Sequence, residues 1–141
     1  MDKKRLNQSI KKSVKGLINI IPIFIAILLL VSVITVLIPK SFYQELFTGN
    51  AFNDSLIGSL LGGVLIGNPL TSYVLGDAFL QNSVSLIAVT SFIVSWTTVG
   101  IIQIPAEAIL LGRSFAIYRN IIAFVFSVIV AFTTSLILYL F

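Results

Sequence analysis

The sequence predicts an all-α integral membrane protein with three full transmembrane helices and one Gly/Pro-broken re-entrant hairpin. Three observations lead to this class: 57% of the 141 residues are apolar, only 10% are charged, and charge-free stretches cover most of the chain. About a quarter of residues are charged in soluble domains, so 9 basic and 5 acidic side chains are too few to coat a water-soluble globule. Disorder is excluded as well, because so much apolar surface would not stay solvated.

Four stretches lack Asp, Glu, Lys and Arg, and each is long enough to be embedded in a bilayer. They are residues 16–38, 55–76, 78–106 and 120–141. About 20 apolar helical residues cross a hydrocarbon core of about 30 Å, and helix is expected because lipid offers the backbone no hydrogen-bond partners. A β-barrel would alternate in polarity, and runs such as 23–33 do not. Residues 16–141 are therefore expected to form a single transmembrane domain.

Residues 1–15 carry six of the nine basic side chains and are expected to form a basic amphipathic segment in the cytoplasm. Leu6, Ile10 and Val14 recur every four residues among the lysines. On a helix this spacing gives one apolar stripe, which suits an anionic membrane surface. A solvated basic tail is the alternative. Nucleic acid is not an expected partner, because the run adjoins a membrane span and lacks interleaved aromatic residues.

The second charge-free stretch contains a face of small residues. Gly58 and Gly62 form one small-xxx-small pair, Gly63 and Gly67 form another, and Ser59 lies on the face of the second pair. Such a face lets another helix approach to backbone contact. The predicted helix-packing residues are therefore Gly58, Ser59, Gly62 and Gly63.

The same stretch is expected to break near Gly67 and Asn68. Proline is disruptive inside a helix, but it suits the first position of a new helix that asparagine caps. We therefore expect a half-helix from Pro69 toward Phe79, with an N-terminus that favours an anion or a polar oxygen. A plain proline kink satisfied by neighbouring helices is the alternative. The predicted substrate-binding residues here are Gly67, Asn68, Pro69, Thr71 and Ser72.

The third stretch shows a milder interruption. Gln103 and Pro105 follow a hydroxyl-rich run, and Pro105 is expected to start a helix with Glu107 in its first turn. A carboxylate at the edge of an apolar run is a functional candidate, whereas the alternative is an interfacial Glu107 paired with Arg113. Trp96 is expected to pack beside the glycine face or to line the pathway. The predicted substrate-binding set is completed by Thr97, Thr98, Gln103 and Glu107.

The charge bias favours a hairpin over a fourth crossing. If all four stretches crossed from a cytoplasmic N-terminus, Arg113 and Arg119 would lie outside, against the positive-inside rule. If the second stretch enters and leaves on the outer side as two half-helices, both arginines are cytoplasmic and the C-terminus is outside. Four transmembrane helices are the alternative. Glycine faces and broken helices need burial in protein, so we expect a homo-oligomer or a complex with a sister half-size subunit.

These features resemble one half of the predicted permease family that includes the organoarsenical efflux permeases. The similarity rests on GSLLGGVLIGNPLTSYVLGDAFL at 58–80 and IIQIPAEAILLGRSFAIYRN at 101–120. It implies a polytopic permease built from repeated halves, with the broken segment near the pathway. Family members that move trivalent arsenicals need cysteines, and because this chain has none the resemblance does not extend to arsenic transport. The nucleoside-recognition "gate" membrane domain is similar in size and in its Gly-rich segment.

The sequence therefore predicts a half-size permease subunit in the plasma (inner) membrane of a prokaryote. It is expected to oligomerise in the lipid bilayer around a pathway for a small polar or anionic solute. A non-transporting scaffold or accessory subunit is the alternative. An enzyme is not expected, because the chain has no histidine, no cysteine and no paired aspartates. No cofactor or metal is expected either, since the acidic residues lack metal-ligand spacing.

Overall fold

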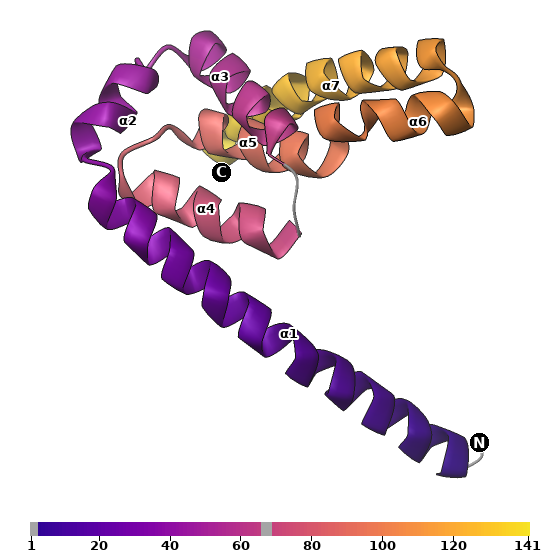
Figure 1. The fold of residues 1–141 in the computed structure, drawn as a ribbon. Helices are drawn as coiled ribbons and strands as arrows, with labels where there is room; N and C mark the ends of the chain where they lie inside the picture. The colour runs from indigo at the N-terminus through magenta and orange to yellow at the C-terminus, as the bar shows by residue number, and fades with distance from the viewer. Residues whose placement is uncertain (1–2, 66–68) are drawn as a thin grey trace.

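The computed structural model describes residues 3–65 and 69–141, and over these ranges the chain is helical without any strand (Figure 1). The helices are α1 (Lys3–Leu37), α2 (Lys40–Leu46), α3 (Ala51–Val64), α4 (Pro69–Gln81), α5 (Leu86–Thr98), α6 (Ile104–Leu111) and α7 (Arg113–Leu140). A short 3-10 helix, Ile101–Gln103, precedes α6. The predicted all-α class is confirmed.

Helix α1 is continuous over 35 residues, which corresponds to a length of about 52 Å. The basic segment 3–15 therefore continues the same helix as the apolar residues that follow it. Figure 1 shows the N-terminal half of α1 projecting away from the other helices, while its C-terminal half packs against α4. The helix ends at Leu37, and Pro39 adopts an extended backbone before α2 begins.

The second charge-free stretch forms two helices rather than one. Helix α3 ends at Val64 and α4 begins at Pro69, so the predicted start of a new helix at Pro69 is confirmed. Gly67 and Asn68, where the break itself was predicted, lie outside the described residues. With 14 and 13 residues, α3 and α4 are each about 20 Å long, too short to cross a core of about 30 Å alone.

Helix α3 starts at the same end of the molecule at which α4 finishes. The carboxylate of Asp54, in the first turn of α3, accepts a hydrogen bond from Ser85 Oγ at 3.2 Å. Ser85 caps the N-terminus of α5 and follows directly after the loop that ends α4. The chain therefore runs out along α3 and returns along α4, with α5 packed between them (Figure 1).

An apolar core closes this end of the fold. Its buried members come from α2 and its C-cap, from the α4–α5 loop and from the start of α5, and they are Tyr43, Phe47, Val84, Ala88 and Val89. The ring of Phe79 lies against Tyr43 and Phe47, with centroid distances of 5.9 and 6.4 Å. Burial raises the pKa of the Tyr43 phenol, because the phenolate would lose its hydration. This core fixes α2 against the α4–α5 loop.

Helices α3 and α5 approach each other at glycines. A methyl group added at Gly58 would overlap the carbonyl oxygen of Ala88, and one added at Gly62 would overlap that of Phe92. Because later positions on α3 meet later positions on α5, the two helices run parallel. Only a residue without a Cβ allows backbones to come this close.

Ser59 and Gly63 also face neighbouring helices. Ser95 Oγ donates to the carbonyl of Ser59 at 2.6 Å, while Ser59 Oγ and Ser127 Oγ lie 2.8 Å apart and join α3 to α7. A Cβ at Gly63 would lie 2.9 Å from Val99 Cγ1. The small-residue face of α3 is therefore filled by helices of the same chain.

Two helical segments in the described part of the chain are long and apolar enough to cross a membrane, judged by length and composition. They are Leu86–Leu111, with 26 residues and a mean hydropathy of 1.7, and Arg113–Leu140, with 28 residues and a mean hydropathy of 2.6. The first consists of α5, the 3-10 turn and α6. Gly112, with φ +94°, makes the turn from α6 into α7, a conformation that favours glycine, and Figure 1 shows these two helices antiparallel.

Candidate functional site

The side chains predicted for the site separate into two groups. Pro69, Thr71 and Ser72 lie at the start of α4, whereas the group Thr97, Thr98, Gln103 and Glu107 lies at the end of α5 and the start of α6. None of the hydrogen bonds between described residues joins the two groups. Gly67 and Asn68 are outside the described residues.

The group at the start of α4 lies beside an apolar cavity. Thr71 lines this cavity, which has a volume of about 510 Å³ and is bounded by helices α1 to α5. Ser72 is fully buried, and its hydroxyl donates to the carbonyl of Pro69 at 2.7 Å within the same helical turn. Pro69 is exposed. The helix boundary at Pro69 therefore has a cavity beside it, but most of the cavity wall is hydrocarbon.

The second group surrounds a break that begins earlier than the sequence indicated. Helix α5 ends at Thr98, and Val99 has an extended backbone with φ −92° and ψ 133°. Gly100 follows with φ −135° and ψ 71°. Pro105 lies in the first turn of α6 together with Glu107, as predicted. The backbone departs from α-helix at Val99 and Gly100, before the proline.

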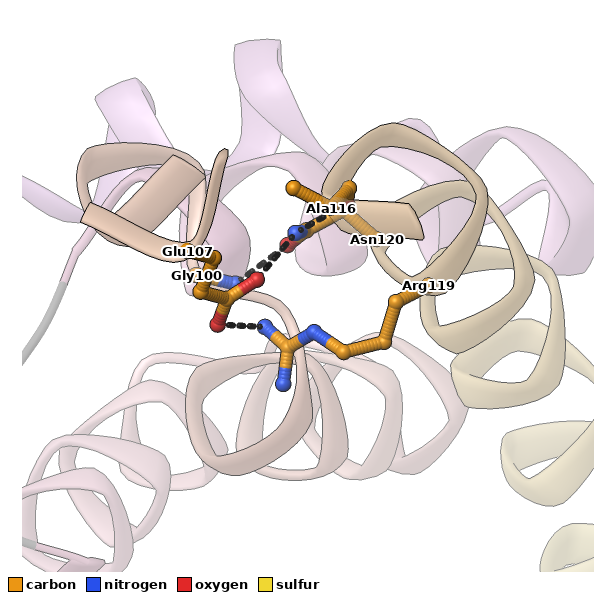
Figure 2. Close-up of polar contacts among 5 residues, drawn as sticks. All are labelled: Gly100, Glu107, Ala116, Arg119 and Asn120. Atoms are coloured by element: carbon orange, nitrogen blue, oxygen red, sulfur yellow. Dashed lines mark hydrogen bonds and ion pairs between the residues drawn. The ribbon is translucent and has the colours of Figure 1, made fainter. Parts of the chain in front are cut away.

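Asn120 of α7 provides a hydrogen-bond partner for the backbone at this break (Figure 2). Its Oδ1 accepts from the N–H of Gly100 at 2.7 Å, and its Nδ2 donates to the carbonyl of Ala116 at 2.9 Å and to Glu107 Oε2 at 3.4 Å. The residue is only 5% exposed. One buried amide therefore connects the break, α6 and α7.

Glu107 also forms an ion pair with Arg119, whose Nη2 lies 2.7 Å from Oε1 (Figure 2). The alternative pairing with Arg113 is wrong. Because α6 and α7 are antiparallel about Gly112, a side chain five residues before the turn lies at the level of side chains at least five residues after it. Arg113 stands directly after the turn and is exposed, so it lies too near the turn to meet Glu107.

Arg119 also lines a groove between α5 and α7. The groove has a volume of about 620 Å³, and its polar lining residues are Thr98, Tyr118 and Arg119, among apolar side chains such as Phe115 and Ile122. The side chain of Arg119 is 37% exposed, whereas that of Glu107 is 18% exposed. Within this side chain, Nε and Nη2 are buried, and Nη2 makes the contact with the half-buried Glu107 carboxylate.

The other predicted residues of this group, Thr97, Thr98 and Gln103, are not part of the network of Asn120, Glu107 and Arg119. Thr98 Oγ1 donates to the carbonyl of Val94 at 2.7 Å, which leaves the hydroxyl lone pairs free to accept a hydrogen bond. Thr97 is exposed and bonds to its own helix. Gln103 is exposed, and its Oε1 lies 2.7 Å from where a Cβ on Gly100 would be, so its amide folds over the break.

Sequence reasoning missed Asn120 and Arg119 as site residues. Both stand at the boundary between a charged segment and a charge-free stretch, which made them look like ordinary flanking residues. A usable signal was present, because Asn120 carries the only carboxamide between 104 and 141. A carboxamide within a long apolar run is costly to bury unless it has partners.

The site combines an amide, a carboxylate and a guanidinium inside a mostly apolar fold. These groups lie within hydrogen-bond reach of one another, so one positive and one negative charge meet at the helix break. In the described part of the chain, no group of acidic residues is placed to hold a metal ion. No model of a known protein family matches the chain, and neither do curated proteins or solved structures.

Proposed function

We propose that the chain is a multi-pass membrane protein and the half-size subunit of an oligomeric permease for a small polar or anionic solute. The observation that carries this proposal is the network of Asn120, Glu107 and Arg119 at the helix break, beside the α5–α7 groove. Transporters build their sites from interrupted helices. An ionisable pair among apolar helices is also a functional-site candidate, because charged groups are costly to place in a membrane.

The exposed surface supports a location in the membrane. Ile109, Leu110 and Leu136 are 85%, 80% and 61% exposed, and they belong to long apolar helices. In water, such a continuous apolar surface would drive association. In a bilayer, lipid tails cover it without cost, and the plasma (inner) membrane is the location we propose.

The proposed topology has three crossings, by α1, by α5 with α6, and by α7, plus a hairpin of α3 and α4. The Asp54–Ser85 hydrogen bond supports this hairpin, because it holds the start of α3 beside the start of α5. Helix α1 leads to that end, so its basic N-terminus lies toward the other end, where Gly112 makes the α6–α7 turn. The basic segment and Arg113 then share the cytoplasmic side.

The groove supports the proposal of an oligomer. In a single chain, the charged side chain of Arg119, which is partly exposed, would face lipid in a groove of apolar side chains, and this is unfavourable. A second copy or a sister subunit seated over the groove would enclose Arg119 and Thr98 in a shared pathway. The solute would then meet the guanidinium, the Thr98 hydroxyl and the Glu107 carboxylate away from lipid.

Proteoliposome flux tests this function. Vesicles that contain the purified chain are mixed rapidly with an excess of glycerol, urea or potassium acetate. Light scattering then follows the recovery of vesicle volume as the solute enters. At least one solute is expected to enter faster than into empty vesicles. Asn120→Leu should reduce that flux at least tenfold, because the break loses its hydrogen-bond partner and Glu107 loses its second contact. Ile109→Ala, on the outer surface, should not change it.

A second candidate function is a non-transporting membrane scaffold. The close α3–α5 packing at Gly58 and Gly62 favours it, because the small-residue face is already filled by helices of the same chain. A scaffold would show no flux for any of the three solutes above that of empty vesicles. The same result, or equal flux in wild type and Asn120→Leu, would contradict the permease proposal.

A further inference from the structure

Three lysines near the start of α1 have no counter-charge in the described part of the chain. Lys11, Lys12 and Lys15 are exposed, and no ion pair between described residues involves them. Asp2 is the only acidic residue before Glu45, so the sequence places no carboxylate beside them along the helix. These three residues, the lysine trio, therefore present unneutralised charge at the surface.

The charges of the lysine trio also repel one another. Lys11 and Lys15 are four residues apart in α1, a spacing that puts two side chains on the same helix face. Like charges at this spacing destabilise a helix, and Lys12 adds a third charge next to them. The trio therefore does not stabilise α1 by itself, whereas an anion bound between the ammonium groups would relieve the repulsion.

The length of α1 sets the depth of the lysine trio in a bilayer. Residues 16–37 of this helix carry no charge and extend about 33 Å, which matches a hydrocarbon core of about 30 Å. Because the helix is continuous from Lys3, Lys15, Lys12 and Lys11 follow at about 1.5, 6 and 7.5 Å beyond the apolar end. The headgroup layer of one leaflet is about 5–8 Å thick, so the trio lies at the level of the lipid phosphates.

We propose that the lysine trio binds the phosphate groups of anionic phospholipids in the cytoplasmic leaflet. Each ammonium group offers three hydrogen-bond donors to phosphate oxygens, and anionic lipids attract basic residues that adjoin a membrane span. Positions 3–5 carry three further charges, but they lie about 17–20 Å beyond the apolar end of α1. That places them outside the headgroups by more than the Debye length of about 8 Å. The inference rests on the membrane location and the cytoplasmic N-terminus proposed above, and not on transport.

The continuity of α1 distinguishes this arrangement from a basic helix that lies flat on the membrane. To lie flat, the segment would have to bend sharply near Gly16, but α1 continues through that position without interruption. Figure 1 shows the N-terminal half of α1 projecting away from the other helices. In the flat arrangement all six basic residues would meet headgroups alike, whereas in the projecting arrangement only the lysine trio does. The two arrangements therefore differ in which basic residues select the lipid.

Electron spin resonance of spin-labelled lipids measures this selection. The full chain is reconstituted in phosphatidylcholine vesicles with a trace of spin-labelled phosphatidylglycerol or spin-labelled phosphatidylcholine, and the motionally restricted fraction gives the relative association constant of the two lipids. The wild type is expected to prefer phosphatidylglycerol about twofold to fivefold, because one basic residue near an anionic surface gives about fivefold and not every lipid site borders the trio. Both leaflets carry the labelled lipid, so the direction of insertion does not affect the ratio.

Two triple variants remove the same charge at different depths. Replacing the lysine trio by Lys11→Gln, Lys12→Gln and Lys15→Gln should bring the ratio close to one, whereas Lys3→Gln, Lys4→Gln and Arg5→Gln should leave it nearly unchanged. Circular dichroism checks that both variants keep the helical content of the wild type.

The outcomes separate this proposal from the membrane location on which it rests. Equal losses in the two triple variants would overturn the proposal, and so would a wild-type chain that restricts both lipids equally. The second of these results would leave the membrane location standing, because lipid is still restricted. If the wild type restricted neither lipid, the membrane location would fail together with the trio.

Discussion

Asp54 is fully buried. One carboxylate oxygen accepts from the N–H of Thr48 at 3.0 Å, and the other accepts from the N–H of Gly49 and from Ser85 Oγ, both at 3.2 Å. The side chain also lies in the first turn of α3, where the helix dipole favours a negative charge. A single carboxylate thus ties the loop before α3 to the cap of α5, and holds the two ends of the hairpin together.

Asp54→Asn is expected to lower the free energy of unfolding by about 2–3 kcal/mol, because an NH₂ group would replace one acceptor and face buried donors. The measurement is SDS-induced unfolding in mixed micelles. Asp77→Asn is the matched control, since Asp77 is exposed and contacts Gln81 at 2.7 Å, and it should change stability by no more than about 0.5 kcal/mol. Equal losses for the two variants would contradict the role assigned to Asp54.

Single residues could be recognised from the sequence more readily than their partners. Glu107 was identifiable because it is a carboxylate at the edge of an apolar run, next to a proline that starts a helix. Its partners, Arg119 and Asn120, could not be identified, since they are 12 and 13 positions away and depend on how tightly the α6–α7 turn closes at Gly112. Local sequence patterns do not show which residues of α6 and α7 lie side by side after the turn.

At the scale of elements, the glycine spacing of α3 predicted a backbone contact but not its partner. Gly58 and Gly62 are four residues apart, and they meet the carbonyls of Ala88 and Phe92, which are also four apart. The match arises because parallel helices present the same rise per turn to each other. Nothing in the α5 sequence identifies it as the partner. The glycines contact backbone carbonyls of α5, and every residue has a carbonyl.

Gly62→Ala is expected to lower the free energy of unfolding by about 1–3 kcal/mol, because its methyl group would push α3 and α5 apart. Gly16→Ala in α1 is the matched control, since nothing lies within 4 Å of the added atom, and it should be neutral or stabilising by up to about 1 kcal/mol. Unfolding of both variants in mixed micelles measures the difference. A Gly62→Ala chain as stable as Gly16→Ala would show that the helices do not rely on this contact.

Helix breaks were predicted well only where proline causes them. Pro69 cannot continue a helix without loss of a hydrogen bond, so the start of α4 follows from covalent chemistry. Val99 and Gly100 break α5 without any proline, because Asn120 supplies a hydrogen-bond partner from a helix 20 residues away. This second break depends on tertiary structure, and so do the cavity beside Thr71 and the groove of Arg119.

At the scale of the whole molecule, the charge pattern and the hydrogen bonds favour the proposed topology by independent arguments. The positive-inside rule favours a hairpin because it places Arg113 beside the basic N-terminus. The Asp54–Ser85 contact favours a hairpin because it holds the loops before α3 and after α4 at one end. The first argument uses charges and the second uses geometry, so an error in one would not carry into the other.

Cysteine labelling tests this topology without background, because the chain has no cysteine of its own. Single variants are made at the exposed positions Ser9, Thr48, Ser83 and Ser114 and treated with a membrane-impermeant maleimide in intact cells. Three crossings and a hairpin predict that Thr48→Cys and Ser83→Cys are labelled at once, whereas Ser9→Cys and Ser114→Cys react only after permeabilisation. Four crossings would exchange the behaviour of Ser83→Cys and Ser114→Cys. That exchange would place Arg113 and Arg119 outside, and would move the groove of the proposed permease away from the cytoplasmic end.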